Sequence, residues 1–210
     1  WSAEITDSIG RFYTQELPED TKAYQEGIFS GREFWEQSQF VYREQRLALN
    51  HMLESFDDGL LFFYFSSVDQ GAHMLFHYMD PDHPIHEEDE LLATGIPTLY
   101  EEMDGVLGQL LEFIEQDDRE TTLMVMSDHG FSPFYWGVNL NSWLLEKGYA
   151  TLRDPSRQGQ TPLFLNVDWE RTTAYAVGLQ GLYVNLQGRE GHGIVPPSDY
   201  EQVLDRLETD

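Results

Sequence analysis

Two groups of carboxylate and imidazole side chains in this sequence have the spacing of metal ligands. Asp69 and His73 are four residues apart, which places them on one face of a helix, about one turn from each other. Asp128 and His129 are adjacent and precede Gly130, where the backbone can turn sharply. A carboxylate oxygen combined with an imidazole nitrogen suits zinc or manganese better than calcium. The sequence therefore predicts four metal ligands.

Each group follows an apolar segment with the composition of a buried strand. Residues 60–65 read LLFFYF, and an apolar run from Thr122 to Met126 ends just before Ser127. In parallel α/β sheets, ligands bind beyond the carboxyl ends of the strands. If the two strands are near neighbours, the four side chains converge on one crevice. Four ligands suggest a site for two ions, because one catalytic zinc needs only three protein ligands.

Simpler explanations of both groups stay open at this point. Asp69 could cap the helix that follows it, with His73 packed beneath a loop. Asp128 could be a turn former, and His129 could be an exposed loop residue. The metal interpretation is favoured because both groups end predicted parallel strands that one crossover could connect.

Apolar residues at helical spacing predict two of the helices around these strands, and a third is expected to end before Asp80 and Pro81. A long amphipathic helix is expected over residues 33–56, a helix over 70–78, and another over 99–114. A strand, two helices and a second strand form a right-handed crossover in a parallel sheet. The predicted class is α/β, an incomplete three-layer α/β/α arrangement with a mainly parallel sheet.

The remainder of the chain predicts smaller elements. A short helix is expected at 143–147, two strands at 172–177 and 181–186 with a glycine-rich turn between them, and a last helix capped by Ser198. We expect residues 1–210 to form part of one catalytic domain. Residues 1–56 would be a helical lead-in, and residues 57–210 would hold the sheet and the metal motifs.

The net charge of the chain limits the kinds of molecule that it can bind. The 210 residues include 12 basic and 38 acidic ones, for a net charge of −26. Such a surface repels nucleic acids and anionic membranes, and an anionic substrate would need a bound metal to offset the field. The sequence has no cysteine, which excludes thiolate ligands, and no apolar run of membrane-spanning length.

Three stretches together carry a resemblance to a known family: YFSSVDQGAH, MSDHGF and AYAVGLQGLYVNLQGRE. The chain resembles the type I phosphodiesterase and nucleotide pyrophosphatase branch of the alkaline phosphatase superfamily from about Ile9 to about Leu204. An SDHG motif with an upstream DxxxH after an apolar strand is a fairly specific combination, whereas either half alone is weak.

The resemblance implies a site with two divalent ions, zinc or else manganese, that hydrolyses small-molecule phosphate esters. Asp69 and His73 would hold one ion, and Asp128 and His129 the other. A third ligand of the first ion is normally a later histidine, for which His192 is the candidate, although its setting looks like a connecting turn.

The resemblance also implies a Thr or Ser nucleophile and a further Asp ligand upstream of everything seen here. Thr6 and Thr14 do not follow a buried strand. This chain alone is therefore expected to be inactive or nearly so. Two alternatives stay open: a phosphomutase or sulfatase of the same superfamily, and a non-catalytic, metal-stabilised binding domain.

Overall fold

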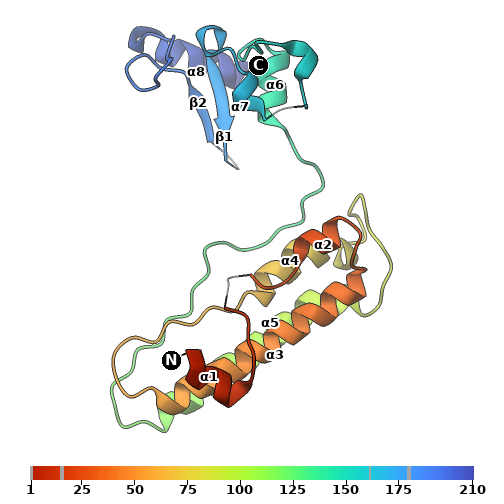
Figure 1. Cartoon of the computed structure of the whole chain (residues 1–210), viewed down its shortest axis with the longest axis vertical. Coiled ribbons are helices and arrows are strands. Elements are labelled where there is room, and N and C mark those ends of the chain that lie inside the picture. The colour runs from red at the N-terminus through yellow and green to blue at the C-terminus, as the bar shows by residue number, and fades with distance from the viewer. Residues whose placement is uncertain (1, 15–16, 161, 179–180) are drawn as a thin grey trace. The chain divides into compact units, whose positions relative to one another are not determined.

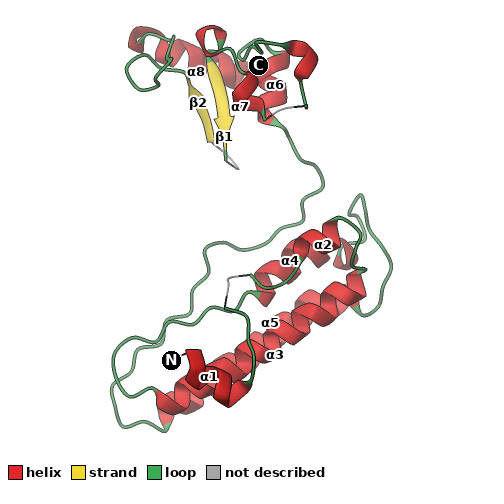
Figure 2. Cartoon of the chain, viewed as in Figure 1, coloured by secondary structure: helices red, strands yellow, loops and turns green. Residues whose placement is uncertain are grey.

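The computed structural model describes residues 2–14, 17–160, 162–178 and 181–210. The chain divides into two compact units, Trp1–Tyr135 and Trp136–Asp210 (Figure 1). Within the described residues the first unit contains helices but no strand, and the second combines helices with a two-stranded antiparallel sheet (Figure 2). The predicted single catalytic domain, with residues 1–56 leading into 57–210, stays a prediction.

Three long helices form the body of the first unit: α3 (Gly31–Ser55), α4 (Ser67–Met79) and α5 (Gly95–Glu115). The sequence predicted all three, and the structure confirms them: α4 and α5 are longer than predicted at both ends, whereas α3 begins two residues earlier and ends one residue earlier. Two short helices, α1 (Ser2–Ile9) and α2 (Thr21–Gln25), precede them. None of the helices in the described parts of the chain is both long and apolar enough to cross a membrane.

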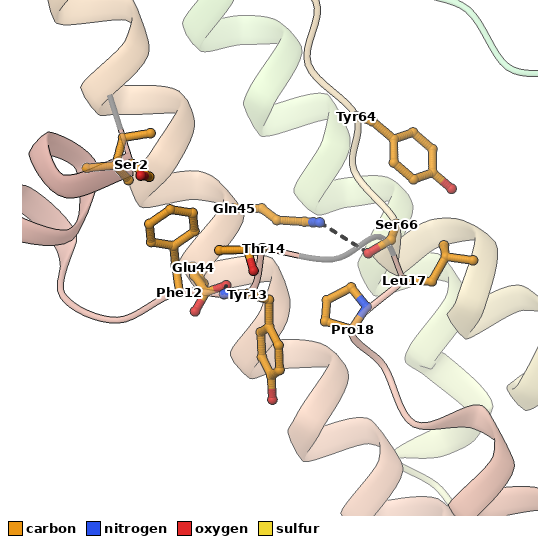
Figure 3. A pocket seen from close by; sticks show the side chains of 11 residues that line it. Ser2, Phe12, Tyr13, Thr14, Leu17, Pro18, Glu44, Gln45, Tyr64 and Ser66 are labelled. Carbon is orange, nitrogen blue, oxygen red and sulfur yellow. Dashed lines mark hydrogen bonds between the residues drawn. The ribbon is translucent and has the colours of Figure 1, made fainter.

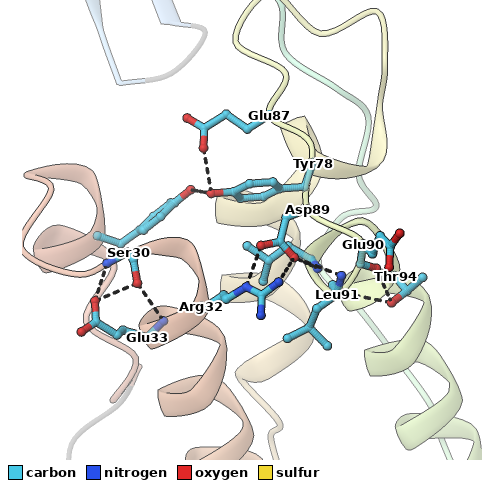
Figure 4. Close-up of polar contacts among 11 residues, drawn as sticks. Ser30, Arg32, Glu33, Tyr78, Glu87, Asp89, Glu90, Leu91 and Thr94 are labelled. Atoms are coloured by element: carbon cyan, nitrogen blue, oxygen red, sulfur yellow. Dashed lines mark hydrogen bonds and ion pairs between the residues drawn. The ribbon is translucent and has the colours of Figure 1, made fainter.

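A capping box explains why α3 begins at Gly31. The Ser30 hydroxyl accepts from the Glu33 backbone N–H, and the Glu33 carboxylate accepts from the Ser30 N–H at 2.8 Å (Figure 4). These hydrogen bonds lower the pKa of Glu33 below its ordinary value.

The first core cluster lies between α3, α4 and α5 and includes the fully buried Phe34, Leu75 and Leu99. Gly71 allows the close approach of α4 to α5, because a β-carbon at that position would overlap Cδ1 of Leu99. Since Gly71 lies between Asp69 and His73 in sequence, this contact helps to place the helix that carries both predicted ligands.

The loop from Asp80 to Glu90 returns the chain from α4 toward a 3-10 turn, η1 (Leu92–Thr94). Asp89 fixes the end of this loop. Its carboxylate accepts from Arg32 Nε at 2.8 Å and from the backbone N–H groups of Leu91 and Leu92 (Figure 4). The same contacts, with the Arg32 bond the largest, lower the pKa of Asp89.

The two strands predicted at 60–65 and 122–126 are not strands in the structure, and the predicted parallel sheet is absent from the described residues. In the first segment, Leu61, Phe63 and Phe65 pack against α3 and α5, whereas Leu60 is 91 % exposed. A strand buried on both faces also needs hydrogen-bonded neighbours at its edges. Neither segment has such a neighbour in the parts of the chain that the structure describes, so both are irregular.

The second unit is built around a β-hairpin. Strand β1 (Ala174–Val177) pairs with β2 (Gly181–Val184) in antiparallel register, with Ala174 opposite Val184. This confirms the two predicted strands, although residues 179 and 180 of their turn lie outside the described residues. Helix α6 (Leu140–Glu146) covers β1 through a core that includes Leu144.

The predicted last helix is α8 (Tyr200–Thr209), which follows a 3-10 turn, η4 (Pro197–Asp199). Ser198 is not its N-cap, because the 3-10 turn moves the cap position to Asp199. Val203 of α8 joins a small core with Val184 and Val195. Three short helical turns complete this unit: η2 (Pro155–Arg157), α7 (Leu163–Asn166) and η3 (Trp169–Arg171).

Two asparagines after the SDHG motif have structural roles. Asn139 is the N-cap of α6 and accepts from the Ser142 N–H at 3.0 Å. The side-chain amide of Asn141 pairs with the backbone of β1 as a neighbouring strand would. It donates to the Ala176 carbonyl and accepts from the Ala176 N–H, both at 2.9 Å. These bonds fasten α6 to β1.

Candidate metal site

Helix α4 positions Asp69 and His73 as the sequence predicted. Asp69 lies in the first turn of the helix and His73 one turn later, so both side chains leave the same face. Asp69 Oδ1 is 3.4 Å from His73 Nε2. Both side chains are partly exposed, which leaves this face open to an ion.

His129 comes to the same point from the segment after α5. Its Nε2 lies 3.8 Å from Asp69 Oδ1, and its ring centroid is 6.0 Å from that of His73. One ligand atom from each of Asp69, His73 and His129 lies within 4.8 Å of the others. The structure thus brings together three of the four predicted ligands.

The two oxygen–nitrogen distances fit ligands of one ion better than hydrogen bonds. At 3.4 Å and 3.8 Å they exceed the usual length of an N–H···O bond. Two donor atoms that are each roughly 2.1 Å from a tetrahedral zinc ion lie roughly 3.4 Å apart. The three donor atoms therefore lie at the spacing of metal ligands and form no hydrogen bonds with one another.

Neighbouring groups orient the donor atoms toward the common point. His129 Nδ1 lies 3.0 Å from the Gly130 carbonyl, so Nδ1 must carry the proton and donate it. The unprotonated Nε2 then presents its lone pair to the group. Gln70 Nε2 donates to Asp69 Oδ2 at 2.6 Å, which leaves Oδ1 for the two histidines. Such bonds fix the tautomer and the orientation of metal ligands.

Phe131 packs against both imidazoles. Its ring lies 4.9 Å from that of His73 and 5.2 Å from that of His129, edge to face in each case, and its other contacts are with the α3–α4–α5 core. Edge-to-face packing is a favoured aromatic geometry. The ring therefore joins the segment carrying His129 to the helix carrying His73.

Two further contacts hold this segment against the loop after α4. His83 Nε2 lies 2.9 Å from the Phe134 carbonyl and donates to it, because its Nδ1 accepts from the Ile85 N–H. The Tyr135 hydroxyl donates to Asp80 Oδ2 at 2.7 Å, and this bond is the largest cause of the lowered pKa of Asp80.

Asp128 lies beside the three-residue group and outside it. Its side chain is 88 % exposed, its Oδ1 accepts from the His129 N–H at 3.1 Å, and its Oδ2 is 3.6 Å from His129 Nε2. Its predicted role as a ligand stays a prediction.

His192 belongs to the second unit, whereas the Asp69 group lies wholly in the first. The His192 side chain is exposed, and its carbonyl accepts from the buried amide of Asn185. Its role as a ligand also stays a prediction.

The two motifs do not single out two residues that contact the group, Gln70 and Phe131. Gln70 lies within the DxxxH motif and Phe131 directly follows the SDHG motif, so their positions were the signal that the sequence offered.

The sequence of this chain was compared with protein families, curated proteins and solved structures. The family model described as type I phosphodiesterase / nucleotide pyrophosphatase matches residues 9–210. No curated protein and no solved structure matches the chain. The family match covers nearly all of the sequence and includes every residue of the three-ligand group. The chain therefore belongs to the type I phosphodiesterase / nucleotide pyrophosphatase family of the alkaline phosphatase superfamily.

Proposed function

We propose that Asp69, His73 and His129 bind a divalent cation in an enzyme that hydrolyses phosphate esters of the phosphodiester or nucleotide pyrophosphate type. The convergence of one carboxylate oxygen and two imidazole nitrogens at coordination spacing carries this proposal. Family membership supports the reaction class, because the family is one of phosphodiesterases and pyrophosphatases.

The donor set suits zinc best among the common divalent ions. Two imidazole nitrogens and one carboxylate oxygen are the ligands of a catalytic zinc that keeps its fourth position open. Calcium and magnesium prefer oxygen ligands throughout. Manganese remains the second choice, because it accepts the same mixture of nitrogen and oxygen.

In its fuller form the proposal has two ions. Asp69, His73 and His129 would hold the first, and Asp128, which lies beside them, would contribute to the second. The ions would neutralise charge on the phosphoryl oxygens and activate a Thr or Ser nucleophile, which we place outside this chain.

The residues of this chain would perform the tasks that binding requires. Gln70 and the Gly130 carbonyl keep the three donor atoms aimed at one point. The backbone N–H of His129 anchors Asp128 beside that point. With 38 acidic residues against 12 basic ones, the protein repels a phosphate ester, so the cation would also supply the attraction that the substrate needs.

Hydrolysis of an aryl phosphodiester by the protein that contains this chain tests the function. Asp69→Asn keeps the size of the side chain and removes its charge, and it should lower kcat/KM at least about 100-fold. Glu36→Gln removes one exposed carboxylate from the same unit and should leave the rate unchanged. A chelator should abolish the activity, and added zinc should restore it. Full activity of Asp69→Asn, or activity that survives the chelator, would refute the proposal.

A further inference from the structure

Glu19 is a buried carboxylate at the N-terminal end of α4. Its residue is 4 % exposed, and its two oxygens accept from the Ser66 hydroxyl, both at 2.9 Å, while Oε1 also accepts from the Ser67 hydroxyl at 3.1 Å. Among the described residues no Lys or Arg forms an ion pair with it. A buried carboxylate without a cationic partner is costly.

The helix gives up a local stabilising bond for this contact. Ser66 is the N-cap of α4, and a serine there commonly accepts from a backbone N–H in the first turn, a bond that contributes about 1 kcal/mol. Here Ser66 makes no side-chain capping bond. Its hydroxyl donates to Glu19 and accepts from Gln45 Nε2 at 3.1 Å.

Asp69 lies three residues after Ser66, in the first turn of α4. The negative charge of Asp69 acts on Glu19 and contributes to the raised pKa of Glu19, for which burial is the largest cause. Two carboxylates at one helix end repel each other, and a cation bound by Asp69 would relieve this repulsion.

The surroundings of Glu19 hold it in place. Ser66, Gln45 and Pro18, the neighbour of Glu19, all line a surface pocket of about 500 Å³ (Figure 3). Ser66 and Ser67 are themselves buried. The carboxylate is therefore fixed beneath the turn that carries Asp69.

We propose that Glu19 is a positioning residue of the metal site. It holds the first turn of α4 through Ser66 and Ser67 so that Asp69 faces the two histidines, and its buried charge strengthens cation binding. This inference rests on the proposed metal site and adds a carboxylate that neither sequence motif contains.

Zinc affinity of the chain, measured by competition with a chromophoric chelator, tests the inference. Glu19→Gln keeps the size of the side chain and one acceptor oxygen, and should weaken zinc binding about 10-fold. Ser67→Ala removes a single hydroxyl and should weaken it less. Glu102→Gln is the matched control, because Glu102 is a partly buried carboxylate of the first unit whose pKa is raised, like that of Glu19, and it accepts from Gln39 away from the site.

A second readout separates positioning from general stability. Each variant is checked for helix content and thermal stability, and only folded protein is titrated. The visible spectrum of bound Co²⁺ should change in Glu19→Gln and stay unchanged in Glu102→Gln. Zinc affinity and a Co²⁺ spectrum equal to those of the wild type in Glu19→Gln would overturn the positioning role. If the wild type binds neither ion, the metal site itself is refuted and the role of Glu19 with it.

Discussion

Asp69 Oδ1 lies 3.8 Å from His129 Nε2, although 60 positions separate the two residues in the sequence. This contact unites two motifs that the sequence offers separately, DxxxH on α4 and SDHG after α5. The three donor atoms of Asp69, His73 and His129 meet because α4 packs on α5 and because the segment after Gly130 is tied back to α4.

The ring of Phe131 is expected to support both histidines. Phe131→Ala removes its contacts with the two imidazoles and with the core, and should lower the free energy of unfolding by roughly 1–2 kcal/mol and zinc affinity about 10-fold. Chemical denaturation and zinc titration measure the two effects. Phe134→Ala is the control, since Phe134 is 79 % exposed in the same segment. Equal effects of the two substitutions would show that Phe131 has no special role.

Gly71 is expected to tolerate no side chain. Gly71→Ala puts a β-carbon into the space of Leu99, which is fully buried, and should lower the free energy of unfolding by about 1–3 kcal/mol. Gly105→Ala provides the contrast, because a β-carbon there meets nothing within 4 Å. That substitution should raise helix stability by about 0.5–1 kcal/mol. Denaturation curves that shift in the same direction would contradict the described packing of α4 on α5.

The raised pKa of Glu19 predicts a pH dependence of stability. Between the ordinary value of 4.5 and the higher pKa of the folded state, the native protein binds this proton more tightly than the unfolded chain does. Stability contributed by Glu19 is therefore present below pH 4.5 and is lost as the pH rises through the folded pKa. Melting temperatures of the wild type and Glu19→Gln should diverge over this window, with the wild type falling further. Parallel profiles would contradict the burial of an ionisable Glu19.

The lysine-poor, acidic composition predicts that salt stabilises the protein. With a net charge of −26, repulsion between carboxylates opposes the compact state. The screening length falls from about 30 Å at 0.01 M salt to about 3 Å at 1 M. The melting temperature should rise across this range of potassium chloride. A constant or falling melting temperature would contradict the idea that repulsion between carboxylates limits the stability of this protein.

The sequence predicted the elements that depend on local pattern. Apolar periodicity located α3 and α5, the break at Asp80 and Pro81 marked the end of α4, and the pairing of β1 with β2 follows from two short apolar runs around glycines. The spacing of Asp69 and His73 predicted their shared face. Residues close together in the sequence are enough to determine these features.

Features that depend on distant partners were missed or wrong. The runs at 60–65 and 122–126 have strand composition, yet a buried strand exists only where other strands pair with it, and composition does not reveal partners. Glu19 and Phe131 gain their roles from contacts with α4, far away in sequence. The grouping of His129 with Asp69 and His73 could be anticipated, whereas the exposed position of Asp128 could not.

Titration of this chain with Co²⁺ tests the central claim most directly, because cobalt bound by nitrogen and oxygen ligands in a tetrahedral site absorbs visible light far more strongly than the aqueous ion. The wild type is predicted to give this absorption and to lose it on addition of zinc. Asp69→Asn and His129→Gln should each lose most of it, while His51→Gln, outside the group, should keep it. A wild-type spectrum identical to that of aqueous Co²⁺, or full absorption in Asp69→Asn, would contradict a metal site formed by Asp69, His73 and His129.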